Sequence, residues 1–169
     1  LMLDLHGRFR VHVACSVVRA LAPYAPTFIE EPVAWERMSL LSDVRRCAEV
    51  PLAAGERLYT LADLARLMET RAVSIVNMDV SRCGGILMGK KIAALAEAHD
   101  VVIAPHISTG PVALAAALQL DMSCCNFFRQ ENFGEHDVSY RDDMVGGWNP
   151  FDDGYFTLAQ REEMLAETF

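Results

Sequence analysis

The sequence lacks the features that mark several specialised classes of protein. Its 169 residues carry 15 basic and 23 acidic side chains, a formal net charge of -8, and the basic residues form no stripe. We therefore expect neither nucleic acid nor an anionic membrane surface as a partner. No apolar run reaches the ~20 residues of a membrane-spanning helix, and the first residues contain no secretory signal.

The cysteines form no recognisable framework. There are five of them, an odd number, and no two are spaced as a CxxC pair: Cys15, Cys47, Cys83, Cys124 and Cys125. We expect neither a set of disulfides nor a zinc site, but small apolar side chains in a reducing compartment such as the cytoplasm.

The sequence does contain a repeat of short apolar runs, each followed by a segment of helical character. The predicted strands are Leu1–Leu3, Thr27–Ile29, Pro51–Ala54, Val73–Val76, Val101–Ala104 and Met122–Phe128. The predicted helices are Arg10–Leu21, Glu36–Cys47, Leu61–Met68 after an N-cap at Thr60, Ile86–His99 and Pro111–Leu120. Strand–helix units that repeat in this way predict a parallel sheet with right-handed crossovers.

A polar side chain stands at the end of each predicted strand or just after it. These residues are Asp4, Glu30, Glu56, Asp79, His106 and Glu131, at intervals of 26, 26, 23, 27 and 25 residues. The interval is close to one βα unit of an eight-fold barrel, whose strand ends converge on one face. An open doubly wound sheet would spread them along a line. The spacing therefore favours a barrel, of which this chain supplies six units, and we expect it to be part of a longer protein.

Three carboxylates end consecutive strands in this pattern: Asp4, Glu30 and Glu56. Carboxylates brought together repel one another, and burying them without a partner is costly. Mg²⁺ resolves this conflict because it takes oxygen ligands and leaves positions for water and substrate. We predict that these three residues hold Mg²⁺. The alternative is structural ion pairs, for example between Glu56 and Arg57 or Arg8.

Two histidines accompany the carboxylates. His6 follows Asp4 by two residues, which places both side chains on one side of an extended strand. His106 ends one predicted strand, and Asp79 ends the strand before it. A carboxylate beside an imidazole fixes its tautomer and suits it to general acid or base catalysis. We predict catalytic roles for His6, His106 and Asp79, and for Glu131 as a group that hydrogen-bonds substrate oxygens or holds a proton.

The motifs that contain these residues resemble those of the enolase superfamily, and most closely its mandelate racemase subgroup. They are Asp4-Leu5-His6-Gly7-Arg8, Ile29-Glu30-Glu31-Pro32, Gly55-Glu56-Arg57, Asp79 with Gly84-Gly85, and Ala104-Pro105-His106 with Gly110-Pro111. Within the subgroup the chain looks most like dehydratases of sugar acids such as galactonate. The resemblance covers residues 1–148, the carboxyl-terminal part of a catalytic barrel, and leaves 149–169 as a tail.

The resemblance implies an α/β fold, a TIM-like (β/α)7β barrel of which this chain covers roughly the last six βα units. Members of the superfamily use a Lys or His base with Mg²⁺. The implied roles are metal ligands at Asp4, Glu30 and Glu56, a base at His106 with Asp79, a further acid or base at His6, and enediolate support at Glu131.

We therefore expect a Mg²⁺-dependent dehydratase, a homo-oligomer, that converts a small sugar acid into a 2-keto-3-deoxy acid through an enediolate. The resemblance also implies that the capping domain and the first barrel strands are missing from this chain. Two alternatives stay open: a racemase or epimerase of a 2-hydroxy acid, and a truncated remnant without activity.

Overall fold

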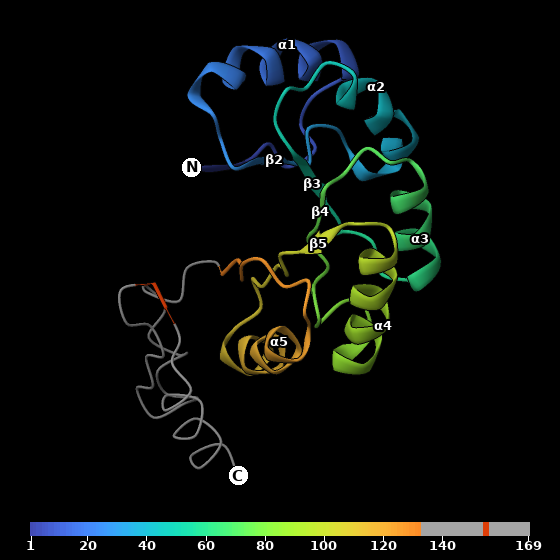
Figure 1. Ribbon diagram of the computed structural model, residues 1–169, viewed down its shortest axis with the longest axis vertical. Helices are drawn as coiled ribbons and strands as arrows, with labels where there is room; N and C mark the ends of the chain where they lie inside the picture. Colours follow the sequence, from blue (N-terminus) through green and yellow to red (C-terminus); the bar gives the residue numbers. More distant parts are fainter. Residues whose placement is uncertain (133–153, 156–169) are drawn as a thin grey trace.

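The computed structural model describes residues 1–132 and 154–155 (Figure 1). Within these ranges the strands are β1 (Met2–Asp4), β2 (Phe28–Glu30), β3 (Leu52–Ala54), β4 (Ile75–Val76) and β5 (Val102–Ile103). The α-helices are α1 (Val11–Leu21), α2 (Leu41–Arg45), α3 (Leu61–Glu69), α4 (Gly85–Ala98) and α5 (Pro111–Ser123), and the 3-10 helices are η1 (Ala22–Tyr24) and η2 (Trp35–Leu40).

The strands are parallel and lie side by side in the order of the sequence, β1-β2-β3-β4-β5. Every connection between neighbouring strands contains a helix, and Figure 1 shows α1, α2, α3 and α4 in an arc along one side of the strands. This is the arrangement of consecutive units in a TIM-like barrel. It confirms the predicted α/β fold with a parallel sheet.

Apolar side chains pack on both faces of the sheet. Ile29, Leu52 and Ile103 belong to the main core and are completely buried. A smaller cluster is formed by Phe28, Ala53, Ile75 and Ala104. Burial on both faces explains why the strands read as continuous apolar runs instead of alternating ones.

The sixth predicted strand, Met122–Phe128, is wrong in the structure. Helix α5 continues through Ser123, whose hydroxyl donates a hydrogen bond to the Leu120 carbonyl. Between the end of this helix and residue 132, the structure has one bridge, between Phe127 and Ile103. The apolar run was therefore shared between the last turn of a helix and a short extended segment, a division that apolar character alone does not reveal.

The predicted helix Glu36–Cys47 is also only partly right. The structure divides this region into η2 and α2, and Arg37 has φ −111° and ψ 25°, outside the helical range. The predicted boundary between residues 148 and 149 lies outside the described residues. In the part of the chain that the structure describes, no helix has the length and apolar character needed to cross a membrane.

Candidate active site

The polar residues predicted to close the strands lie along one edge of the sheet. Asp4 and Glu30 are the last residues of β1 and β2 and are paired across the sheet. Glu56 follows β3 by two residues, whereas Asp79 and His106 each follow a strand by three and form a parallel bridge with one another. All five therefore stand at the carboxyl-terminal edge, where barrel enzymes hold their active sites.

Glu131 reaches the same edge although the described residues form no sixth strand. Its backbone N–H donates to the Pro105 carbonyl at 2.9 Å, directly before His106. One of its carboxylate oxygens, Oε2, is buried without a hydrogen-bond partner. Burial, opposed by His106, raises the pKa of Glu131 to about 7.

Glycine fixes the position of Glu56. Gly55 has φ +147°, and a Cβ built there would lie 3.1 Å from the backbone nitrogen of Asn77. A side chain at this position would force the neighbouring backbones apart, because the three atoms nearest to the added Cβ are main-chain atoms of Asn77 and Met78. The absent side chain allows β3 and the segment after β4 to approach, which holds Glu56 close to the residues that follow Asn77.

His106 and Asp79 form the predicted dyad. The ring Nδ1 lies 2.9 Å from Asp79 Oδ2, and the other carboxylate oxygen accepts a hydrogen bond from the Ser81 backbone N–H at 2.8 Å. Burial would raise the pKa of Asp79, but the hydrogen bonds from His106 and Ser81 lower it. The ionised carboxylate thus holds the proton on Nδ1 and fixes the orientation of the ring.

The other ring nitrogen of His106 faces a second carboxylate. His106 Nε2 lies 2.9 Å from Glu56 Oε2. Burial lowers the pKa of His106, but hydrogen bonds to Asp79 and Glu56 outweigh it and raise the pKa to about 9. When Glu56 holds no cation, the two carboxylates therefore favour the charged form of the imidazole.

Glu56 also contacts further basic side chains. Its carboxylate lies 3.3 Å from Arg57 Nε, 3.3 Å from His6 Nδ1 and 3.4 Å from Arg82 Nη1. Burial would raise the pKa of Glu56, but His106, His6 and Arg57 lower it to about 2. The ion pair with Arg57 confirms that part of the structural alternative, and it leaves the metal assignment of Glu56 untested.

Two arginines contact the predicted site residues, and neither was predicted as part of the site. Arg82 Nε lies 3.3 Å from Asp79 Oδ2, and its Nη2 donates to the Ser108 hydroxyl at 3.2 Å. Arg57 Nη2 lies 3.2 Å from Glu31 Oε2. From the sequence, Arg57 is expected only as an ion-pair partner, and Arg82 is missed. The signal for Arg82 is its position three residues after Asp79, within the turn that precedes α4.

Among the described residues, Glu30 and Glu31 have too few basic neighbours to offset their burial and the nearby acids. Burial first, and then Glu131, Asp4 and the neighbouring acids, raises the pKa of Glu30 to about 9. Burial, opposed by Arg57, raises the pKa of Glu31 to about 7. Hard divalent cations bind where carboxylate oxygens crowd together, and the raised pKa values and the unpartnered oxygen of Glu131 fit such an ion.

The tightest donor set differs from the predicted one. Of the residues that the structure describes, Asp4, His6 and Glu31 place ligand atoms within 4.8 Å of one another. His6 approaches Asp4 through a turn and not through strand alternation: β1 ends at Asp4, and His6 has φ 51°. The His6 ring lies 3.1 Å from Asp4 Oδ2. Which carboxylates take the ion therefore stays a prediction.

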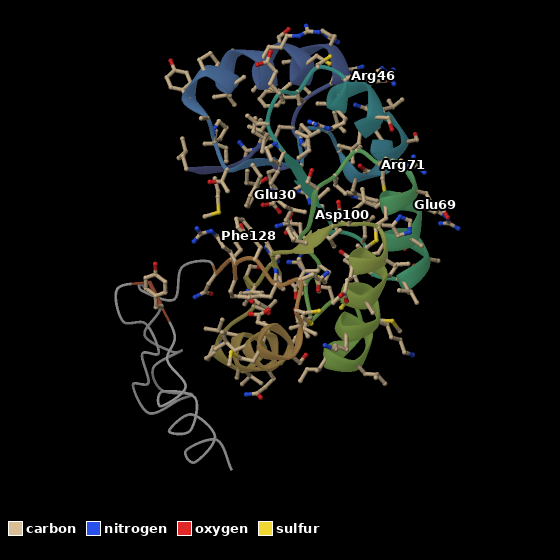
Figure 2. All side chains as sticks on the ribbon, viewed as in Figure 1. Glu30, Arg46, Glu69, Arg71, Asp100 and Phe128 are labelled. Carbon is tan, nitrogen blue, oxygen red and sulfur yellow. The ribbon has the colours of Figure 1, made fainter. Side chains whose placement is uncertain are left out.

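Two cavities open beside these groups. One, of about 420 Å³, is lined by Asp4, Glu30 and Glu131 among others. Figure 2 shows Glu30 at the strands, inside the arc of helices. The other, of about 580 Å³, is lined by residues that include His6 and His106. Both have the size of small-molecule sites, so the edge offers acidic ligands on one side and proton-transfer groups on the other.

Comparison with known proteins gives a consistent set of relatives. A family model described as enolase C-terminal domain-like matches residues 1–162. A D-galactonate dehydratase from Ralstonia pickettii (strain 12J) is 44% identical over 129 residues, which is 76% of this chain and 34% of the relative. This chain thus spans about a third of that protein's length.

Solved structures agree. The mandelate racemase/muconate lactonizing enzyme from Sulfitobacter sp. is 34% identical with a TM-score of 0.86, over 93% of this chain and 39% of that one. A mandelate racemase/muconate lactonizing enzyme-like protein from Roseovarius sp. TM1035 is 33% identical with a TM-score of 0.85, again over 93% and 39%.

Proposed function

This chain belongs to the enolase C-terminal domain-like family, and on that premise we propose that it is the catalytic part of a Mg²⁺-dependent sugar-acid dehydratase. The substrate is an aldonate similar to galactonate. Removal of the proton next to its carboxylate gives an enediolate, the β-hydroxyl leaves as water, and a 2-keto-3-deoxy acid results. The observation that carries the proposal is the buried His106–Asp79 pair beside a crowd of carboxylates, and the D-galactonate dehydratase relative supports the substrate class.

Asp4, Glu30 and Glu56 are the residues that would hold Mg²⁺. They come from three adjacent units, and the charges of Asp4 and Glu56 both raise the pKa of Glu30. When bound, the ion supplies positive charge that stabilises negative charge developing on a substrate carboxylate. Glu31 is not a ligand in this proposal: it forms an ion pair with Arg57, which also contacts Glu56.

His106 is the base in this proposal. Because Asp79 accepts the hydrogen bond from Nδ1, the substrate proton is taken up at Nε2. Ring orientation is fixed by burial, since only 3% of His106 is exposed. A fixed ring loses little entropy when the substrate arrives, which lowers the barrier to proton transfer.

His6 and Glu131 take the remaining roles. The His6 side chain is 51% exposed and lies against Asp4 and Glu56, so a protonated ring can donate to the departing β-hydroxyl. Glu131 is buried and its pKa is raised to about 7, so its protonated form is populated near neutral pH. A protonated carboxyl can donate a hydrogen bond to a substrate oxygen in the transition state.

An assay for 2-keto acids tests the proposal directly. The whole chain is incubated with Mg²⁺ and a panel of aldonates that includes D-galactonate, and semicarbazide detects the product. We expect 2-keto acid to form and its formation to stop when EDTA removes the metal. A change in optical rotation without 2-keto acid would instead indicate a racemase or epimerase. A folded, Mg²⁺-binding chain that leaves every aldonate unchanged would overturn the proposal.

A further inference from the structure

Two cysteines lie next to each other on the outer helices, away from the active site. Cys15 is in α1, and Cys47 is two residues beyond the end of α2. Although 32 positions separate them in the sequence, Cys47 is near enough to Cys15 to raise the pKa of its thiol. From the sequence the cysteines are expected to be scattered, and nothing in the proposed reaction uses this pair.

Two crossed contacts join the segments that carry the two cysteines. Cys15 Sγ donates to the backbone carbonyl of Asp43 at 3.8 Å, one helical turn before Cys47. Arg19, one turn after Cys15, donates from Nη2 to Cys47 Sγ at 3.3 Å. Each helix therefore reaches past its own cysteine to the other one. Both cysteines therefore lie at the packed surface between α1 and α2, and a disulfide forms there when the two sulfurs approach to bonding distance.

Both thiols are partly exposed, whereas Cys83 is buried with 3% exposure. Small polar oxidants in water can therefore reach the pair. Burial first, and then the neighbouring Cys47, raises the pKa of the Cys15 thiol. Cys47, whose sulfur accepts a hydrogen bond from the Arg19 guanidinium, is the sulfur that we expect to react first.

We propose that Cys15 and Cys47 are a peroxide-sensitive pair that closes to an intramolecular disulfide. The Cys47 thiolate attacks hydrogen peroxide, the O–O bond breaks, and Cys47 becomes a sulfenic acid while hydroxide leaves and is protonated to water. The Cys15 sulfur then attacks the sulfenic sulfur, loses its proton and expels a second water. Two thiols are oxidised to one disulfide, and one peroxide is reduced to two waters.

The bond would close a loop that carries one predicted site residue, Glu30. The closed loop runs from Cys15 to Cys47 and contains β2, with Glu30 at its end. A cross-link of this span restricts the unfolded chain and so stabilises the folded one. We expect Tm of the oxidised chain to rise by about 5 °C or more.

Peptide mapping tests the pair specifically. Trypsin releases Cys15 in peptide 11–19 and Cys47 in peptide 47–57. The whole reduced chain is treated with hydrogen peroxide, free thiols are alkylated, and the digest is analysed by mass spectrometry. We expect the two peptides joined, with two hydrogens lost, and their separation after dithiothreitol. Cys47→Ser should abolish the cross-link, whereas Cys125→Ser, at an exposed thiol, should leave it unchanged.

Several results would overturn the inference. They are recovery of the two peptides singly, each alkylated or each oxidised to sulfinic acid, and a cross-link that joins other cysteines. A cross-link in the monomer that leaves Tm unchanged would overturn the stabilising role. Equal rates of peroxide consumption by the unsubstituted chain and Cys47→Ser would show that Cys47 is not the reacting sulfur.

Discussion

At the scale of single residues, two buried glutamates of the site have pKa values shifted in opposite directions. Glu56 lies against His106, Arg57 and Arg82, and its pKa is lowered to about 2. Glu30, equally buried, has mostly acids for neighbours, and its pKa is raised to about 9. The direction of each shift follows from the sign of the neighbouring charges, because both residues share the cost of burial.

Replacing the base tests the dyad. We expect His106→Asn to lower kcat for aldonate dehydration by about 100- to 10,000-fold, because Asn cannot take up the α-proton. Mg²⁺ binding, measured by calorimetry, should persist. His99→Asn, at the exposed end of α4, is the matched control. Continued exchange of the α-proton with solvent deuterium in His106→Asn would contradict the assignment.

Asp121 predicts a pH-dependent stability that is independent of the active site. It is 4% exposed, neither carboxylate oxygen has a hydrogen-bond partner among the described residues, and burial raises its pKa to about 8 from 3.8. The folded state therefore binds a proton that the unfolded state has lost, so stability falls as pH rises from about 4 to about 8. We expect Asp121→Asn to flatten this slope and to stabilise the chain at pH 8 by roughly 1–3 kcal/mol.

Urea unfolding at about pH 5 and about pH 8 measures the effect. Asp100→Asn is the control, because Asp100 is exposed and Asn accepts its left-handed backbone, φ 59°. Parallel pH slopes in the Asp121→Asn variant and the unsubstituted chain would contradict the role given to Asp121.

The sequence predicted which residues share this edge of the sheet better than it predicted the contacts among them. Strand-end spacing brought Asp4, Glu30 and Glu56 to one edge, because parallel units repeat their geometry. It did not reveal that Glu56 would pair with Arg82, because that contact depends on side-chain orientation across two units. Nor did it reveal the turn at His6, where a positive φ and not strand alternation brings the ring to Asp4.

At the scale of elements, the bounds of α1, α3 and α4 were each predicted to within one residue. Helix α3 begins after Thr60, as expected, whereas η2 and α2 replace one predicted helix and α5 overruns into the sixth predicted strand. Regular apolar spacing survives in α3 because one face packs on the sheet. Where apolar residues cover all sides of a segment, as in α5, the pattern does not say where a helix ends.

Removing the cap of α3 tests this local explanation. The Thr60 hydroxyl accepts a hydrogen bond from the Asp63 backbone N–H at 3.1 Å. We expect Thr60→Ala to lower the free energy of unfolding by about 1 kcal/mol, because that N–H loses one of its two acceptors and keeps only the Thr60 carbonyl at 3.1 Å. Thr60→Ser keeps the hydroxyl and should retain most of the stability in urea unfolding. Equal losses in the two variants would show that the methyl group, and not the cap, matters.

At the scale of the whole molecule, a bound cation would join the ends of neighbouring strands. We expect Mg²⁺ at about 100 times its Kd to stabilise the chain by about 2.7 kcal/mol, seen as a rise in Tm. Glu56→Gln should weaken Mg²⁺ binding in calorimetry, because it removes one anionic ligand. An unchanged Kd in Glu56→Gln would remove Glu56 from the ligand set.

Glu69→Gln is the control for charge alone. Glu69 is exposed at the end of α3, and Figure 2 shows it on the outer side of the helices, far from Glu30. The Glu69→Gln substitution removes the same charge without changing the predicted ligands, so the Mg²⁺ affinity of this variant should equal that of the unsubstituted chain. A similar loss in both variants would reduce the effect to net charge.

Three residues at or next to the cavity beside His106 lie outside the two apolar clusters of the core. Tyr59 and Ser108 line this cavity, Thr109 is exposed next to it, and none of the three belongs to either apolar cluster. A randomised library at these positions would therefore sample new substrate preferences at little cost in folding. Laboratory evolution toward other hydroxy acids has a natural starting point there.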